Sequence, residues 1–181
     1  MLYYVASDYH FFHKNIIKYS ERPFKNVEEM NAELVKRWNE TVTNSDVVYY
    51  LGDFAMGKFG MSKDNTLKDM VSSLNGYKKI LFLGNHDNSQ GKMYEYGWDV
   101  VLDQAVVNTV YGRVLLRHYP LLSQHRSSYK MQNILCCIHG HIHVGPDDEY
   151  NINASCEMTD YRPILIESII KRWKNGKGKC L

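Results

Sequence analysis

The sequence predicts a protein of the α/β class, in which buried β-strands alternate with amphipathic helices. Short apolar segments rich in β-branched and aromatic residues recur along the chain, and the first two are separated by a segment whose apolar residues have helical spacing. A strand, a helix and a second strand form a βαβ unit with parallel strands and a right-handed crossover. Several expected strands also end in Asp, Asn or His, at the position where α/β proteins place their functional sites.

Length, charge and cysteine content limit the alternatives. The chain has 181 residues, of which 44% are hydrophobic, so we expect one domain over residues 1–181 with a substantial core. A formal net charge of +2 with mixed signs does not favour a dedicated nucleic-acid-binding protein. The four cysteines match no disulfide framework or zinc ribbon. No basic segment followed by a long apolar one opens the chain, and no apolar run approaches the ~20 residues of a membrane span, so we expect a cytoplasmic protein.

The first half of the chain has the clearest alternation of elements. The 27–41 segment is expected to be a helix, because Asn26 and Glu29 have the spacing of a capping box and Met30, Leu34 and Trp38 recur on one face. The other elements expected here are strands at 2–6, 47–51 and 80–83, a short helix over 14–20, a loop over 54–65 and a helix over 66–75.

The second half contains shorter apolar segments. Tyr111-Gly112 separates two of them and predicts a hairpin. The elements expected here are strands at 100–101, 105–110, 114–117, 134–138 and 151–154, and a closing helix over 164–173.

Polar side chains with metal-binding chemistry follow five of the expected strands. They are Asp8 and His10, Asp53, Asn85 and His86, His118, and His141 and His143. Carboxylate, imidazole and amide groups without a thiolate suit Mn, Fe, Zn or Ni better than a cysteine-type structural zinc site. Without His86 the set still holds seven candidate ligands, which is too many for one catalytic ion and suits two ions that share a bridging carboxylate.

The order of these blocks resembles the calcineurin-like metallophosphoesterase superfamily. The blocks are Asp8-Tyr9-His10, Gly52-Asp53, Gly84-Asn85-His86-Asp87, His118 and Gly140-His141-Ile142-His143. The segment from Ser7 to Asn15 and the Arg22-Pro23-Phe24 that follows it resemble a branch of small bacterial and phage members. The resemblance implies a four-layer α/β/β/α sandwich, in which two mixed β-sheets are flanked by helices.

The resemblance also implies a role for each block. Asp8, His10 and His143 would hold a first divalent metal ion, and Asn85, His118 and His141 a second. Asp53 would bridge the two ions, together with a hydroxide that attacks phosphorus. His86 would protonate or stabilise the leaving group, and Asp87 would orient His86.

The implied reaction is hydrolysis of a phosphodiester or phosphomonoester in a small or nucleotide substrate, with manganese as the first metal to try. Phosphoprotein phosphatases of the superfamily carry a further Asp-Arg-Gly block, whereas Gly52-Asp53 here continues as Phe54-Ala55-Met56. That difference favours a phosphodiesterase. The alternatives are a metal-dependent nuclease on single-stranded nucleic acid and a non-catalytic scaffold. His13, His125 and Arg126 are either substrate contacts or solvated side chains. The sequence does not predict an oligomeric state.

Overall fold

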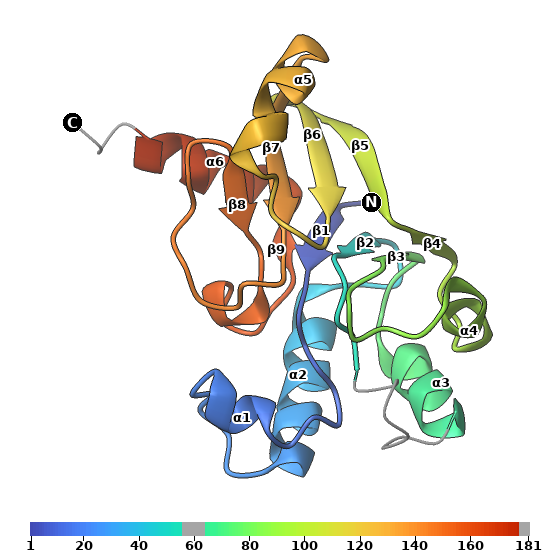
Figure 1. The fold of residues 1–181 in the computed structure, drawn as a ribbon. Coiled ribbons are helices and arrows are strands. Elements are labelled where there is room, and N and C mark those ends of the chain that lie inside the picture. Colours follow the sequence, from blue (N-terminus) through green and yellow to red (C-terminus); the bar gives the residue numbers. More distant parts are fainter. Residues whose placement is uncertain (56–63, 178–181) are drawn as a thin grey trace.

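Two β-sheets form the centre of the molecule, which is described from a computed structural model that covers residues 1–55 and 64–177 (Figure 1). The first sheet has the order β4-β3-β2-β1-β9 and the second the order β5-β6-β7-β8. The strands of the first sheet are β1 (Tyr3–Ala6), β2 (Val47–Tyr50), β3 (Lys78–Phe82), β4 (Val100–Leu102) and β9 (Ile164–Leu165). Those of the second are β5 (Gln104–Thr109), β6 (Gly112–Arg117), β7 (Ile134–His139) and β8 (Asn151–Asn153).

Both sheets are mixed, as predicted. Strands β1 to β4 are parallel, and β9 is antiparallel to β1 at the edge. In the second sheet β5 and β6 form the expected antiparallel hairpin, and β6, β7 and β8 are parallel. Parallel strands bring their carboxyl ends to one edge of each sheet, so the polar residues that follow them are gathered there.

Helices cover the outer face of the first sheet. They are α2 (Val27–Thr41), α3 (Asp64–Ser73) and α4 (Gln90–Glu95), and the short α1 (Ile16–Tyr19) lies beside α2 (Figure 1). The cap of α2 forms as predicted, since the Asn26 side chain accepts a hydrogen bond of 2.8 Å from the Glu29 amide. Trp38 of α2 is fully buried and belongs to the same apolar cluster as Tyr50 and Leu81 of the sheet.

The core between the two sheets joins strands that are distant in sequence. Val5 and Phe82 of the first sheet pack in one cluster with Leu116 and Ile138 of the second, and all four are fully buried. Each such side chain contributes about 1.5–3 kcal/mol relative to an exposed one. Helix α6 (Ile166–Lys177) closes this core with Ile170.

The outer face of the second sheet carries a smaller apolar cluster. Leu115 and Cys137 are buried there, and Tyr129 of the short helix α5 (Arg126–Met131) packs against them. Two 3-10 turns, Ser123–His125 and Cys156–Met158, complete the described chain. The layers therefore follow the predicted α/β/β/α order.

The structure differs from the predicted elements in three places. Helices α4 and α5 occupy segments for which no element was predicted, because single short turns carry too little periodicity to be recognised. Ile164–Leu165 forms β9 instead of the start of the closing helix, because it pairs with Tyr4 and Val5 of β1. Most of the loop predicted over residues 54–65 lies outside the described residues, and α3 begins at Asp64.

Candidate metal centre

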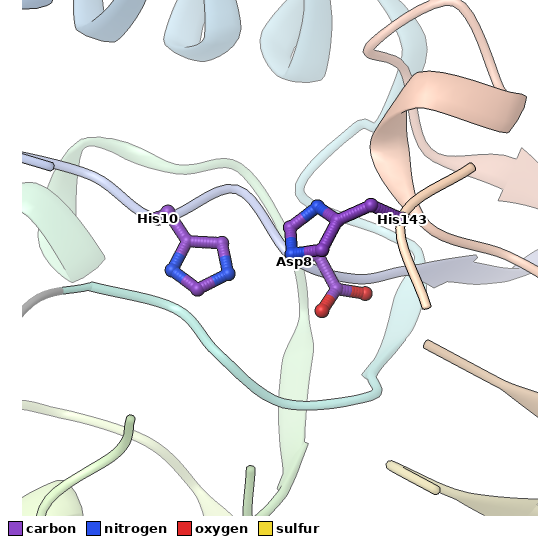
Figure 2. A group of neighbouring side chains, drawn as sticks. All are labelled: Asp8, His10 and His143. Atoms are coloured by element: carbon purple, nitrogen blue, oxygen red, sulfur yellow. The ribbon is translucent and has the colours of Figure 1, made fainter. Parts of the chain in front are cut away.

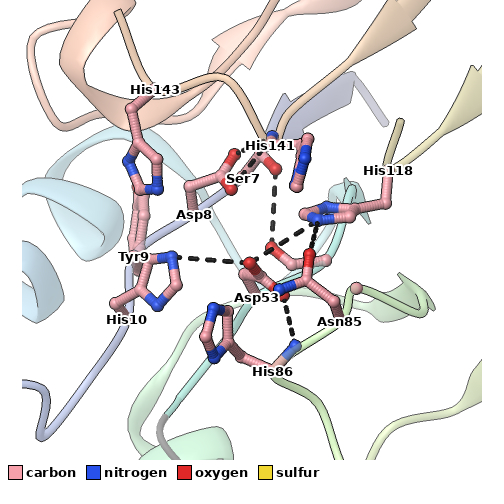
Figure 3. A network of polar contacts seen from close by, with 12 residues as sticks. Ser7, Asp8, Tyr9, His10, Asp53, Asn85, His86, His118, His141 and His143 are labelled. Atoms are coloured by element: carbon pink, nitrogen blue, oxygen red, sulfur yellow. Dashed lines mark hydrogen bonds and ion pairs between the residues drawn. The ribbon is translucent and has the colours of Figure 1, made fainter. Parts of the chain in front are cut away.

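The carboxyl ends of five strands meet at one place, where the predicted ligands lie together (Figure 3). In the first sheet the register pairs Ala6 with Tyr50 and Tyr50 with Leu81. Main-chain hydrogen bonds continue this pairing beyond the strands, from the Asp8 amide to Gly52 (3.0 Å) and from the His10 amide to Asp53 (3.1 Å). The second sheet reaches the same place through the ends of β6 and β7, and the Gly140 amide donates to the His118 carbonyl.

A first cluster consists of Asp8, His10 and His143, each of which offers a ligand atom within 4.8 Å of the others (Figure 2). His10 is 1% exposed, and neither of its ring nitrogens has a hydrogen-bond partner among the described residues. Burial lowers the pKa of His10 well below its ordinary value and raises that of Asp8. Unpartnered, neutral imidazole nitrogens beside a buried carboxylate fit a divalent cation, which would satisfy both groups.

A second cluster consists of Asp53, His118 and His141, whose ligand atoms also lie within 4.8 Å of one another. The Leu51 carbonyl accepts a hydrogen bond of 2.8 Å from His118 Nδ1, which leaves Nε2 with its lone pair toward the site. Asn85 joins this cluster, because its Oδ1 lies 3.1 Å from His118 Nε2. All four groups are carboxylate, imidazole or amide, as predicted.

Asp53 lies between the two clusters. Its Oδ2 is 3.5 Å from His10 Nε2 and also 3.5 Å from His118 Nε2. Its Oδ1 accepts a hydrogen bond of 2.8 Å from the His86 amide. The carboxylate is 2% exposed, and the hydrogen bond from the main chain fixes its position between the two rings.

The backbone is strained at these residues. A positive φ is unusual outside glycine, and here five candidate ligands have one: Asp8 (58°), His10 (51°), Asp53 (56°), His141 (73°) and His143 (51°). Left-handed conformations of this kind cost about 1–3 kcal/mol each and concentrate at functional sites.

Two glycines allow the strand ends to approach one another closely. A Cβ atom on Gly84 would collide with the Asp53 side chain, and one on Gly140 would collide with the side chains of Ser7 and Asp8. The Gly84 and Gly140 of the sequence blocks therefore have a steric role, because the ligand carboxylates occupy the space of the absent Cβ.

Asp87 has a different place from the one we expected. We predicted that it orients His86, but both of its oxygens accept hydrogen bonds from main-chain amides. The donors are Asp53 (2.9 Å), Phe54 (2.9 Å) and Gly84 (2.8 Å). Burial, followed by the charge of Asp53, raises the pKa of Asp87 to about 6. Asp87 thus fixes the loop that carries Asp53, because these three main-chain hydrogen bonds occupy both of its carboxylate oxygens.

An open pocket of about 470 Å³ lies beside the first cluster. Measured between ring centroids, the His10 ring is 5.1 Å from the His86 ring and 5.6 Å from the His13 ring. His13 therefore lines the pocket beside the first cluster. The pocket is lined by His10, His13, Ile16, Tyr19, Ser20, His86, Ile142, His143 and Val144.

The structure does not bring His125 and Arg126 to the site. They lie at the start of α5, which precedes β7, whereas His141 follows the other end of that strand (Figure 1). Arg126 is paired with Asp148 at 2.5 Å. After His118 the chain runs back along the second sheet, and this return could not be predicted from a polar loop of unknown path. Their position before β7 therefore gives no support to a substrate contact by these two residues.

Sequence reasoning missed Arg22 and Glu157, which lie behind the first cluster. Glu157 Oε1 is 2.9 Å from His143 Nδ1 and 2.7 Å from the Arg22 guanidinium. Burial alone would raise the pKa of Glu157, but the hydrogen bond from His143 and the charge of Arg22 lower it to about 2. Arg22 was noted only as part of Arg22-Pro23-Phe24, and its partner lies in a segment that has no recognisable motif.

Comparison with known proteins agrees with this arrangement. The sequence profile of the calcineurin-like phosphoesterases matches residues 1–179, and the chain belongs to that family. An uncharacterized protein of Methanocaldococcus jannaschii is 37% identical over 96% of this chain and 92% of its own. A crystal structure of a protein of unknown function from Aquifex aeolicus is 29% identical, with a TM-score of 0.76 over 94% of this chain and 98% of that one.

A third similarity concerns the fold alone. The structure of an archaeal phosphodiesterase has a TM-score of 0.50 at 18% identity, over 87% of this chain and 86% of that one. Membership of the family makes the protein a hydrolase of phosphoester bonds, with two groups of side chains suited to divalent metals. No helix among the described residues is long and apolar enough to cross a membrane.

Proposed function

We propose that the protein is a metal-dependent phosphodiesterase with two divalent ions. The first ion would be held by Asp8, His10 and His143, and the second by Asn85, His118 and His141. Asp53 would bridge them. The observation that carries this proposal is the position of Asp53. Its Oδ2 lies 3.5 Å from Nε2 of His10 in the first cluster and 3.5 Å from Nε2 of His118 in the second.

The donor set supports manganese as the metal to use in a first assay. Its carboxylates, imidazoles and amide oxygen suit divalent ions between the hard and soft extremes, which include Mn, Fe, Zn and Ni. Two such ions would neutralise charge on the attacking and leaving oxygens of a phosphoester.

The side chains of the pocket have complementary tasks. The His86 ring lies beside the first cluster, 5.1 Å from the His10 ring, where it would protonate the leaving oxygen. The His13 ring is 6.4 Å from the His86 ring and faces the same pocket, where it would contact the bound phosphoryl group or its leaving portion.

The pocket lining favours a diester over a monoester. Among the described residues it contains four imidazoles, a tyrosine, a serine and three aliphatic side chains, with no Lys or Arg. A diester carries one negative charge and two organic groups, whereas a monoester dianion gains from guanidinium or ammonium contacts. The aliphatic and aromatic side chains would pack against the second organic group, which can be that of a nucleotide.

Hydrolysis of bis(p-nitrophenyl) phosphate and p-nitrophenyl phosphate, each with Mn²⁺ or with a chelator, tests this function. We expect manganese-dependent hydrolysis of the diester. If the monoester is hydrolysed as well, we expect its kcat/KM to be lower than that of the diester. Preference for the monoester would contradict the phosphodiesterase assignment. Turnover of neither would favour a scaffold, and cleavage of a labelled single-stranded oligonucleotide instead of small diesters would favour a nuclease.

A further inference from the structure

A buried ion pair lies directly behind the first cluster. Arg22 follows α1, and Glu157 belongs to the 3-10 turn Cys156–Met158, so the two are far apart in sequence. The side chains are 0% and 4% exposed, and Glu157 Oε1 accepts from Arg22 Nε (3.0 Å) and from the terminal guanidinium nitrogen (2.7 Å). Two charge-assisted hydrogen bonds to one carboxylate oxygen hold the guanidinium and the carboxylate in a defined relative position.

Glu157 also fixes the ring of His143. A carboxylate only accepts hydrogen bonds, so the 2.9 Å contact requires the proton on His143 Nδ1. That tautomer leaves Nε2 with its lone pair, on the side of the ring opposite Glu157. A carboxylate behind a metal-binding imidazole fixes its orientation and makes it a stronger donor.

Arg22 extends the same network to the other side of the cluster. Its guanidinium donates to the main-chain carbonyls of Asp8 (2.6 Å) and Tyr9 (2.7 Å). These carbonyls belong to the strained segment that carries Asp8 and His10. One buried ion pair therefore holds both chain segments that supply the first cluster.

The second cluster has no equivalent support among the described residues. His118 Nδ1 donates to the neutral Leu51 carbonyl, and no carboxylate among the described residues forms an ion pair with the His141 ring. A buried ion pair is by itself weak evidence for stability, because desolvation of the two charges offsets their attraction. The Arg22–Glu157 pair, however, contacts a candidate ligand of the first cluster and none of the second. That asymmetry indicates a functional role.

We infer that Glu157, held by Arg22, is a positioning residue that sets the metal affinity of the first cluster and leaves the second cluster unaffected. The inference rests on the proposed dinuclear centre. Loss of the carboxylate would free the His143 ring to rotate and to change tautomer. Outer partners of this kind typically contribute 10–100-fold in metal affinity.

Titration of the metal-free protein with Mn²⁺, followed by calorimetry and by electron paramagnetic resonance, tests this inference. For Glu157→Gln we expect one of two Mn²⁺ sites to weaken by about 10–100-fold while the other keeps its wild-type affinity. Glu149→Gln is the matched control, because it makes the same substitution at a side chain that is 74% exposed and whose Oε1 lies 3.9 Å from Lys130 Nζ at the surface.

A second variant covers the possibility that Glu157→Gln does not fold. Glu157→Asp keeps a charge for Arg22 and withdraws the carboxylate from His143 by one methylene, so we expect the same selective loss of affinity. Unchanged affinity at both sites in the folded variants would overturn the inference. Equal weakening of both sites, with a matching loss of Tm in the metal-free protein, would show a general structural role and overturn it as well. A wild-type protein that binds fewer than two Mn²⁺ ions would contradict the dinuclear centre itself.

Discussion

At the scale of single residues, the proposed function assigns metal ligation and proton transfer to two neighbours in the chain, Asn85 and His86. Asn85 lies with the second cluster, while the His86 ring faces His10 and the pocket. The His86 amide meanwhile donates to Asp53, which fixes the backbone irrespective of the side chain. A substitution of the imidazole should therefore leave the ligands in place.

We predict that His86→Ala keeps its full Mn²⁺ content and lowers kcat on a chromogenic diester by about 10²–10⁴-fold, the usual contribution of a general acid. Metal content is measured by atomic emission after dialysis. His125→Ala, at an exposed position distant from the site, is the control and should match the wild type. Loss of metal in His86→Ala would show that His86 is a ligand, contrary to our assignment.

The same scale shows what sequence reasoning can find. The residues in the recognised blocks, such as Asp8 and His141, were predicted from their order and their place after strands, and the structure brings them together. Glu157 could not be found this way, because its contact with His143 depends on the path of a loop. The prediction for His125 and Arg126 depended on a loop path in the same way, and here the loop leads away from the site.

At the scale of elements, the approach of β7 to β1 determines how closely the two sheets meet at the site. Gly140 follows β7, and its Cβ position is occupied by Ser7 and Asp8, which follow β1. Predicted elements such as α2 and the parallel strands were correct because their signals are local. Strand β9 was missed because only the pairing with Tyr4 and Val5 makes Ile164–Leu165 a strand.

We predict that Gly140→Ala destabilises the protein by about 1–3 kcal/mol or more, as overpacking of a filled space does. Gly91 in α4 is the matched control: a Cβ there meets nothing within 4 Å, so Gly91→Ala should stabilise by about 0.5–1 kcal/mol through helix propensity. Urea denaturation followed by circular dichroism measures both. Equal stability of the two variants would mean that the strand ends separate without cost.

At the scale of the whole molecule, buried thiols lie in all three apolar clusters of the described chain. Cys136 lies between the sheets, Cys137 on the outer face of the second sheet, and Cys156 on the helix side of the first. All three are fully buried, while Cys180 lies outside the described residues. Their ionisation is therefore linked to unfolding of the whole structure.

Burial raises the pKa of Cys137 to about 12, whereas an unfolded cysteine has a pKa of about 8.5. Between these values the unfolded chain has lost the thiol proton and the folded chain keeps it. The folded state thus binds more protons, and the free energy of unfolding must fall as pH rises, by on the order of 1 kcal/mol per pH unit for one thiol. Urea denaturation at pH 8 and pH 10 should show this fall in the wild type and a smaller one in Cys137→Ala. The variant loses some stability at both pH values through the missing sulfur, so the quantity to compare is the change in the free energy of unfolding between the two pH values. An identical change in both proteins would show that Cys137 ionises as freely in the folded protein as in the unfolded chain.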